Sequence, residues 1–527
     1  LVIAGGEVLD GTGSPAGRAD VGIRGDEIAA VGDLSGATAA LTLDAHGRIV
    51  APGFIDLLGN SQAAVLIDPT LEGKIRQGVT TEVTGEGRSP GPVSEAMAEE
   101  MERTKPEGWP IVDWRTLGEF GDVVMRKGSA LNFAFYVGAT NPREMVMGHA
   151  ERAPTAEELA RMVAIVRQAV GEGAVGVASA LIYPPGRFAT TQELAALARA
   201  GGSYWTHLRN EAGAIDAAID EAVTIAREAG VPLNIFHLKV GGQQNWGRMK
   251  RVIARIDAAR TSGVDVASCV YPYTATSTAL TSIVPAWALE GSYADFVARL
   301  RDPSTRARIR SELASGRLAN GGASTIMVRG IPSESMKRWE RMHLDQIAKG
   351  MGAEPAEAAI RLFEESRSSP IGIYFSLDEE DMKSALAQPW VAVCSDSGAV
   401  VGSMRASGAH PRAYGTFPRI LGKYVREEKL IPLEEAVRKM TSLAAARAGL
   451  ADRGSVRAGM KADLVVFDPS RIADVSTYED PHHFSVGIDH VVVNGTPVLR
   501  DGRMTGALPG RIIGRNGVIR ARASAGP

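Results

Sequence analysis

Four residues that could bind a metal ion or move a proton each stand at the end of a short apolar run. His207 ends the run YWTH, and His237 ends the run LNIFH. Glu86 stands in VTGEG, and Asp396 stands in VCSDS. Neutral imidazole and carboxylate groups together suit zinc, and a catalytic zinc site usually has three protein ligands and an open position for water. These residue types therefore predict a zinc site with a further carboxylate beside it.

Each of these residues also has an ordinary structural interpretation. A histidine at the end of a strand is often a hydrogen-bonded core residue. An aspartate that follows a strand commonly caps a helix. We favour the metal site because all four residues are expected at the same end of one fold.

The spacing of the two histidines indicates how the chain presents them. They are about one strand–helix unit apart, because a helical pattern separates the two runs. Apolar residues recur there with the period of a helix, and the positions expected to be buried are Ile215, Ile219, Ala222, Val223 and Ala226. Alternating strands and helices are typical of a parallel α/β fold. In a closed parallel barrel, the C-terminal ends of the strands face one pocket where chemistry is carried out.

The middle of the chain contains eight strand candidates with helical patterns between most of them. Eight parallel strands with interleaved helices predict a TIM-like (β/α)8 barrel. The candidates are Gly53–Leu58, Thr80–Gly85, Leu131–Val137, Ala174–Ala180, Tyr204–His207, Leu233–His237, Val264–Tyr271 and Trp390–Ser395.

Both ends of the chain are rich in short strands separated by Gly and Asp turns. We expect residues 1–50 and 448–510 to form one small β-sandwich domain from both termini. The catalytic barrel is predicted over residues 51–447. An insertion is expected at about residues 275–370, because that interval is too long for one crossover. Residues 511–527 are predicted to be a loosely ordered tail.

Composition excludes several classes of protein. The chain has 527 residues, of which 45% are hydrophobic and 23% are charged, and its net charge is −3, so nothing suggests a nucleic-acid partner. No apolar run approaches the roughly 20 residues of a membrane span. Two cysteines exclude a disulfide framework. We expect a small-molecule partner and leave a homo-oligomer open. A cytoplasmic location is slightly favoured, and a periplasmic or secreted one would follow if a signal peptide preceded Leu1.

The sequence resembles the N-acyl-D-amino-acid deacylase (D-aminoacylase) family of the amidohydrolase superfamily. The similar stretches span nearly the whole chain and include APGFID, KIRQGVTTEVTGEG, LIYPPGRFATTQEL, THLRNE, FHLKVGG, YPYTATST, VCSDS and HPRAYGTFPRILGKYVREE. The resemblance implies a metal-dependent barrel with a flanking β-sandwich that hydrolyses the amide of N-acylated D-amino acids.

The resemblance also implies roles for individual residues. His207 and His237 would bind zinc, and Asp396 would handle the water proton. Lys239, Tyr183 and Tyr271 would help to bind substrate, and the assignment of Tyr271 is weakened by the nearby Tyr273. We further expect Lys239 and Arg209 to be cations near the substrate carboxylate. For Arg209 an ion pair with Glu211 or a neighbouring acid is an equal alternative.

Two departures from the family pattern concern the metal. The superfamily's first strand ends in His-x-His, whereas this chain has Leu58-Gly59-Asn60-Ser61. The family's cysteine ligand on strand two is replaced by Glu86, so that Glu86, His207 and His237 remain as the predicted ligands. We therefore expect about one Zn2+ per chain. Asn60 is a candidate for a hydrogen bond to substrate.

Three functions follow as hypotheses. The first is a metal-dependent amide hydrolase that deacylates N-acyl-D-amino acids or cleaves a D-configured peptide, with Asp396 as general base and acid. The second is a hydrolase with the same barrel that acts on another amide, a carbamate or a lactone. The third is a catalytically silent binding or scaffold protein. Retention of His207, His237, Lys239 and Asp396 together argues against the third.

Overall fold

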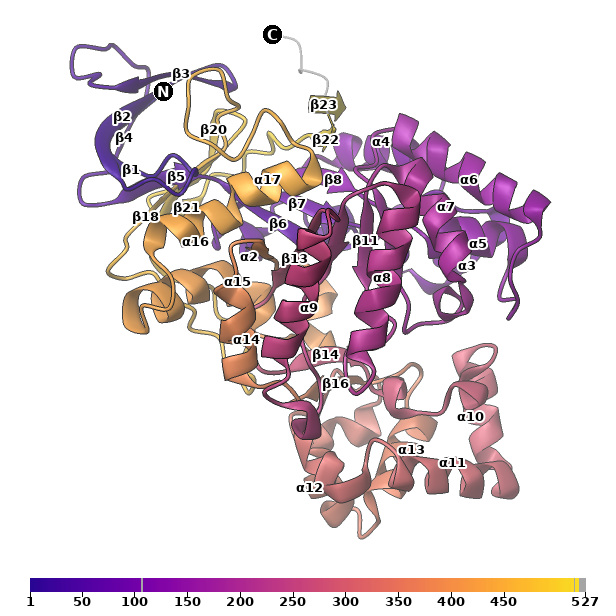
Figure 1. Cartoon of the computed structure of the whole chain (residues 1–527). Coiled ribbons are helices and arrows are strands. Elements are labelled where there is room, and N and C mark those ends of the chain that lie inside the picture. Colours follow the sequence, from indigo (N-terminus) through magenta and orange to yellow (C-terminus); the bar gives the residue numbers. More distant parts are fainter. Residues whose placement is uncertain (106–107, 516, 521–527) are drawn as a thin grey trace.

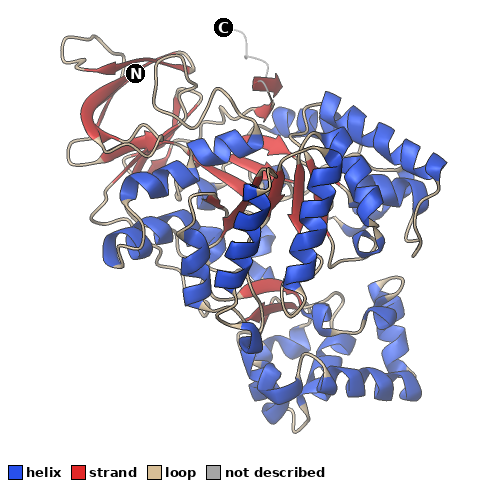
Figure 2. Ribbon diagram, viewed as in Figure 1, coloured by secondary structure: helices blue, strands red, loops and turns tan. Residues whose placement is uncertain are grey.

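The central part of the chain alternates strands and helices, with a β-rich region on one side and a helical region on another (Figures 1 and 2). This computed structural model describes residues 1–105, 108–515 and 517–520. The termini contribute the β-rich region, and the segment that follows β13 contributes the helical region, which lies at the bottom of Figure 1.

The nine central strands occupy the eight positions that the sequence predicts, because β8 and β9 share one of them, and strands at neighbouring positions pair in parallel. One sheet contains β6, β7 and β8, and a second contains β9 to β13 and β17. Only Tyr136 separates β8 from β9, and a parallel bridge joins Gly59 to Ser397 at the two ends of the series. The strands are β6 (Phe54–Gly59), β7 (Val79–Thr84), β8 (Asn132–Phe135), β9 (Val137–Gly138), β10 (Val177–Ala180), β11 (Tyr204–His207), β12 (Leu233–Ile235), β13 (Val266–Val270) and β17 (Val391–Val393).

Amphipathic helices connect these strands. The five positions predicted to be buried between the histidines are all buried on α8 (Ile215–Ala229). α6 begins with a capping box of Thr155 and Glu158, which satisfies free N–H groups of its first turn. The other helices among these strands are α1 (Ala64–Ile67), α2 (Glu72–Ile75), α3 (Glu95–Thr104), α4 (Leu117–Lys127), α5 (Thr140–Met147), α6 (Ala156–Gly171), α7 (Thr191–Gly201), α9 (Met249–Thr261) and α14 (Glu379–Leu386). α15 (Arg412–Arg419), α16 (Leu433–Met440) and α17 (Ser442–Ala448) follow β17.

Strands from both ends of the chain form a single nine-stranded sheet. β18 pairs antiparallel with β5 in the register Leu464↔Pro52 to Phe467↔Ile49, so the predicted association of the two termini is confirmed. That this sheet folds into a sandwich stays a prediction. The strands are β1 (Val2–Val8), β2 (Gly17–Arg24), β3 (Glu27–Gly32), β4 (Thr42–Asp44), β5 (Ile49–Pro52), β18 (Leu464–Phe467), β19 (Ile488–Val493), β20 (Thr496–Arg500) and β21 (Arg503–Met504).

A segment with its own hydrophobic core occupies the position of the expected insertion. β14 (Thr276–Ala279), β16 (Ile371–Tyr374) and β15 (Ile326–Arg329) form an antiparallel sheet. Its core includes Phe296, Leu313 and Phe363 and is separate from the core of the central strands. The helices are α10 (Tyr293–Arg301), α11 (Pro303–Ser315), α12 (Leu344–Gly350) and α13 (Pro355–Glu365). Because β14 follows directly after β13, this segment lies beside the C-terminal ends of the parallel strands.

The prediction of a loosely ordered tail does not hold for two strands that lie within residues 511–527. β22 (Ile512–Gly514) pairs with β8 at Ile512↔Phe133 and with β23 (Gly517–Arg520). Ile512 and Ile513 are buried, so this segment adds apolar side chains to the core despite its Arg and Gly content. Residues 521–527 lie outside the described residues.

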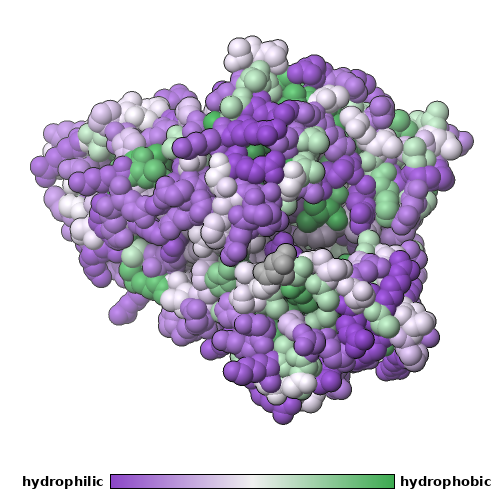
Figure 3. All heavy atoms as spheres, turned by 60° about the horizontal axis from the view of Figure 1, so that its bottom comes forward, coloured by the Kyte–Doolittle hydropathy of each residue, from purple (hydrophilic) through white to green (hydrophobic). Residues whose placement is uncertain are grey.

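The described surface carries no large apolar area on the face shown in Figure 3, where hydrophilic residues surround small hydrophobic patches. None of the described helices is long and apolar enough to span a membrane.

Candidate metal centre

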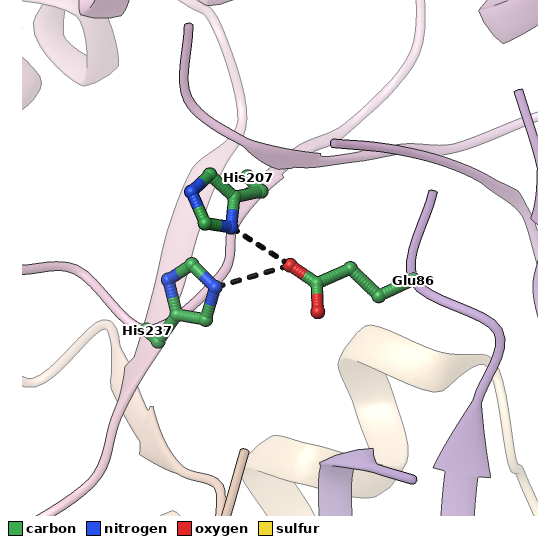
Figure 4. Close-up of side chains that lie close together, drawn as sticks. All are labelled: Glu86, His207 and His237. Carbon is green, nitrogen blue, oxygen red and sulfur yellow. Dashed lines mark hydrogen bonds and ion pairs between the residues drawn. The ribbon is translucent and has the colours of Figure 1, made fainter. Parts of the chain in front are cut away.

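Three side chains from separate strand–helix units converge at the C-terminal ends of the strands (Figure 4). Glu86 lies two residues after β7, His207 ends β11, and His237 lies two residues after β12. Nδ1 of His207 is 3.0 Å and Nε2 of His237 is 3.1 Å from the same oxygen, Oε1 of Glu86. One ligand atom of each residue lies within 4.8 Å of those of the other two. The predicted set of three donors is therefore brought together.

The spacing of these atoms fits a tetrahedral zinc ion. With bonds of about 2.0–2.1 Å, two ligand atoms of such an ion lie about 3.3 Å apart. Both histidines are buried and Glu86 is 15% exposed, which leaves the centre open on one side. Burial acts to raise the pKa of Glu86, but hydrogen bonds with His207 and His237 and their charge lower it below its usual value. Glu86 is thus held as an anionic ligand.

Glu211 faces the other nitrogen of both imidazoles. Its Oε2 is 3.3 Å from Nε2 of His207, and its Oε1 is 3.2 Å from Nδ1 of His237. A carboxylate on the far side of metal-binding imidazoles supports their orientation, and Glu211 lies within ion-pair distance of both rings. Burial raises the pKa of Glu211, but the charges of His207, Lys239 and His237 lower it well below the usual value, so that the carboxylate remains ionised.

Lys239 lies against the same centre. Its Nζ donates to Oε1 of Glu211 and lies near Nδ1 of His237, both at 2.7 Å. The ammonium is also 5.9 Å from the centre of the Tyr271 ring. Lys239 is therefore close to the predicted pocket, and Glu211 is the anion it contacts.

Asp396 lies three residues after β17 and pairs with an arginine that the sequence analysis did not consider. Nη1 of Arg412 donates to Oδ2 of Asp396 over 2.8 Å, and its guanidinium lies 4.8 Å from the centre of the Tyr271 ring. The Tyr271 hydroxyl is buried without a hydrogen-bond partner among the described residues. The Tyr273 hydroxyl instead donates to Asp474 over 2.8 Å, which favours Tyr271 as the pocket residue.

Tyr183 connects the metal centre to the inserted segment. Its ring meets that of His207 edge-on at 5.8 Å, and its hydroxyl lies 3.2 Å from Oγ1 of Thr278 on β14. The side chain is 41% exposed. β14 thus lies beside the mouth of the site, as expected for an inserted lid.

Arg209, which is predicted to bind substrate, contacts neighbouring strand–helix units, and its role toward substrate stays a prediction. Its guanidinium donates twice to Glu221, over 2.8 Å each, and to the carbonyl groups of Arg187 and Ala189. Glu221 lies on α8, whereas Arg187 and Ala189 lie in the segment before α7. The guanidinium of Arg209 therefore joins two neighbouring strand–helix units. The alternative of a structural ion pair holds, with Glu221 as the partner.

The end of the first strand provides no imidazole. Asn60 donates its backbone N–H to the carbonyl of Ser397 over 3.4 Å, and the Gln62 side chain accepts from Thr84. Beside Gly59, the space for a side chain is filled by Glu82, whose Cγ would lie 2.0 Å from an added Cβ. The role of Asn60 toward substrate stays a prediction.

Comparison with known proteins agrees with this arrangement. The profile of the amidohydrolase family matches residues 335–499. A D-aminoacylase from Alcaligenes xylosoxydans xylosoxydans is 38% identical, over 98% of this chain and 97% of that protein. The chain belongs to the D-aminoacylase family of amidohydrolases.

Solved structures of the D-aminoacylase family superpose closely. One of them is a D-aminoacylase structure described for its binuclear metal centre, with one-metal activation and second-metal attenuation. It matches with a TM-score of 0.81 at 36% identity, and the match covers 98% of this chain and 99% of the D-aminoacylase chain. Another is an N-acyl-D-glutamate deacylase from Bordetella bronchiseptica, complexed with zinc and a phosphonate inhibitor that mimics the tetrahedral intermediate. It matches with a TM-score of 0.80 at 33% identity, and the match covers 97% of this chain and 98% of the deacylase chain. The family resemblance is thus confirmed, and the protein is a hydrolase acting on C–N bonds.

Sequence reasoning missed two residues of this family site. Glu211 stands four residues after His207 in THLRNE, a spacing that could have suggested a contact with the histidine. Arg412 stands in HPRAYG, with no spacing relation to the other site residues, so no local signal could have identified it.

Proposed function

We propose that this protein is a zinc-dependent deacylase of N-acyl-D-amino acids. The observation that carries the proposal is the convergence of Glu86, His207 and His237, beside a carboxylate, Asp396, that contacts an arginine. The first three supply the ligands of a hydrolytic zinc, and the last two supply a proton acceptor and a cation for the substrate's carboxylate. The relatives that are named deacylases of N-acyl-D-amino acids support this substrate class.

We also propose a closed (β/α)8 barrel over residues 51–447 and a β-sandwich formed by residues 1–50 and 448–510. The parallel order of eight strands and the Gly59–Ser397 bridge support the barrel. The shared nine-stranded sheet supports the second domain.

Glu86, His207 and His237 would hold one zinc ion. When bound, zinc would act as a Lewis acid toward the scissile carbonyl and lower the pKa of water. A second ion would find only Glu86, Asp396 and water, because Leu58-Gly59-Asn60 provides no imidazole. Such coordination holds zinc weakly, which supports one ion per chain.

Asp396 would carry the proton during hydrolysis. It accepts a proton as water adds to the amide carbonyl, and it returns that proton to the nitrogen as the C–N bond breaks. The products are a carboxylate and a D-amino acid. Tyr183 lies beside His207, and its hydroxyl would donate a hydrogen bond to the carbonyl oxygen as negative charge develops there.

Arg412, Lys239 and Tyr271 would bind the substrate's carboxylate. Both cations lie over the Tyr271 ring, whose hydroxyl has no described partner and could donate to an anion. A guanidinium can hold a carboxylate with two hydrogen bonds, so a substrate would compete with Asp396 for Arg412. The competition would free Asp396 for proton transfer only when a carboxylate is bound.

Turnover of a substrate panel tests the proposal. The purified, zinc-loaded protein would be assayed with N-acetyl-D- and N-acetyl-L-amino acids, dipeptides and lactams. We expect turnover of N-acetyl-D-amino acids, loss of activity with a strong chelator and recovery with zinc. Absence of turnover of every N-acetyl-D-amino acid by zinc-loaded protein would contradict it.

A further inference from the structure

Asp396 adopts a backbone conformation that an L-residue rarely takes. Its φ is +49°, in the left-handed region, where a side chain crowds the backbone. Such conformations persist when the surrounding structure holds the chain on both sides, and they are frequent at active sites. The residues that hold Asp396 are therefore of interest for the reaction.

The residue before Asp396 is bound by a buried carboxylate. The backbone N–H of Ser395 donates to Oδ1 of Asp56 over 2.9 Å, and the Ser395 hydroxyl donates to Oδ2 over 2.5 Å. Asp56 comes from β6, at the other end of the parallel series. Two contacts with one carboxylate fix both the backbone and the side chain of Ser395.

Lys74 of α2 binds the residues on both sides of Asp396. Its ammonium donates to Oγ of Ser395 over 2.7 Å and to the carbonyl of Ser397 over 2.5 Å. It also donates to Oδ2 of Asp56 over 2.7 Å. Lys74 and Asp56 are fully buried, so water does not compete for these contacts.

A third buried acid in the same cluster forms no hydrogen bond or ion pair with residues 395–397 in the part of the chain that the structure describes. Glu82 is 3.3 Å from Lys74 and accepts the N–H and the hydroxyl of Ser61, both over 2.7 Å. The Ser61 hydroxyl accepts the N–H of Ala399. Lys74 and Asp56 therefore hold Ser395 and Ser397, the immediate neighbours of Asp396. Glu82 and Ser61 form the other half of the cluster, which hydrogen-bonds to the same loop at Ala399.

We propose that Lys74 and Asp56 are positioning residues that clamp Ser395 and Ser397 and so hold Asp396 in its left-handed conformation. The φ of a residue sets the direction of its side chain, so the clamp aims the Asp396 carboxylate at the reacting amide. This inference rests on the proposed function of Asp396 as proton acceptor and donor. Without the clamp, the backbone would relax and the carboxylate would leave its productive position.

Two serines provide a matched pair of variants for the test. Ser395→Ala removes the hydroxyl that both Lys74 and Asp56 contact, and Ser61→Ala removes an equally buried hydroxyl from the other half. Misplacement of a catalytic group costs up to about 10²-fold, so we expect Ser395→Ala to lower kcat by about 10- to 10²-fold. Its KM and zinc content should stay close to those of the parent protein. Ser61→Ala should keep the parental kcat. Equal effects of the two variants on kcat, or none, would overturn the proposal.

Lys74→Met and Glu82→Gln test the clamp from the side of the charges. We expect Lys74→Met to lower kcat more than Ser395→Ala, with zinc retained, and Glu82→Gln to keep kcat. Lys74→Met leaves the buried Asp56 without a cation and can therefore make the protein insoluble. In that case the two serine variants decide the question.

A crystal structure of Ser395→Ala separates failure of the clamp from failure of the proposed function. An inactive parent protein would sink the proposed function. A φ at Asp396 that leaves the left-handed region in Ser395→Ala but not in Ser61→Ala would still support the clamp. An unchanged φ in both would overturn it.

Discussion

At the scale of residues, two of the carboxylates at the candidate site have different surroundings. Glu86 contacts the two imidazoles, whereas Asp396 contacts Arg412 and, within the described part of the chain, forms no hydrogen bond with either histidine. The first arrangement suits a metal ligand, and the second suits a group that exchanges protons and is released when a substrate carboxylate takes its cation.

We expect Asp396→Asn to lower kcat by at least about 10²-fold, because an amide cannot accept the proton of water. The zinc content should not change, since Asn has nearly the shape of Asp and the three ligands remain. Kinetics and elemental analysis of the same preparation check this. Near-parental turnover would remove Asp396 from the mechanism.

Glu211 holds both imidazoles from behind, so we expect Glu211→Gln to weaken zinc binding by about 10- to 100-fold, as loss of such contacts typically does. Competition with a metal-sensitive chelator measures the affinity. Glu221→Gln is the control, because Glu221 pairs with Arg209 and not with a histidine. Equal zinc affinity of the Glu211 variant and the parent would show that the imidazoles need no such support.

At the scale of elements, the candidate site residues lie at the end of a strand or in the turn that follows one, and a second layer of elements covers these turns. β14 approaches Tyr183 from one side, and α15 presents Arg412 at its first turn. His237 has a φ of +34°, so it too stands in a left-handed turn and not within the strand that the sequence predicts.

The C-terminal strands complete the nine-stranded sheet, and their removal should expose it. We expect deletion of residues 454–527 to yield insoluble protein. β18 lies between β5 and β19, so the deletion would leave the apolar edge of β5 unpaired, and β8 would lose β22. Solubility after expression is the measurement, and deletion of residues 521–527, which removes none of these strands, is the control. A soluble and active product of the larger deletion would show that the sheet does not need its C-terminal half.

At the scale of the whole molecule, the metal content depends on residues drawn from distant parts of the chain. The space beside the end of β6 is occupied by Glu82 and the Lys74 cluster and not by imidazoles. This fully buried cluster joins β6, α2, β7 and the residues after β17, so it ties the ends of the parallel series together.

We expect one equivalent of zinc per chain after dialysis, measured by elemental analysis. Excess zinc should leave kcat unchanged, because the ligands of a second ion are missing. This would differ from the related D-aminoacylase described for second-metal attenuation. Two equivalents that survive dialysis would mean that other groups complete a second site.

The sequence by itself determined the order of the strands and the three candidate metal ligands that the fold brings together. His207, His237 and Glu86 follow short apolar runs, and parallel strands joined in chain order necessarily bring such ends to one side. These are local signals combined with a simple topology. The association of the two termini was predictable for a similar reason, because neither end has enough strands to cover its own apolar residues.

Only the tertiary structure decided which charged residues act together. Arg209 and Arg412 are identical in type, yet one pairs with Glu221 on a neighbouring helix and the other with Asp396. Lys74 reaches residues more than three hundred positions away. A long charged side chain can form an ion pair with any opposite charge that the fold places near it. Its partner therefore depends on the positions of distant loops, which no local sequence pattern encodes.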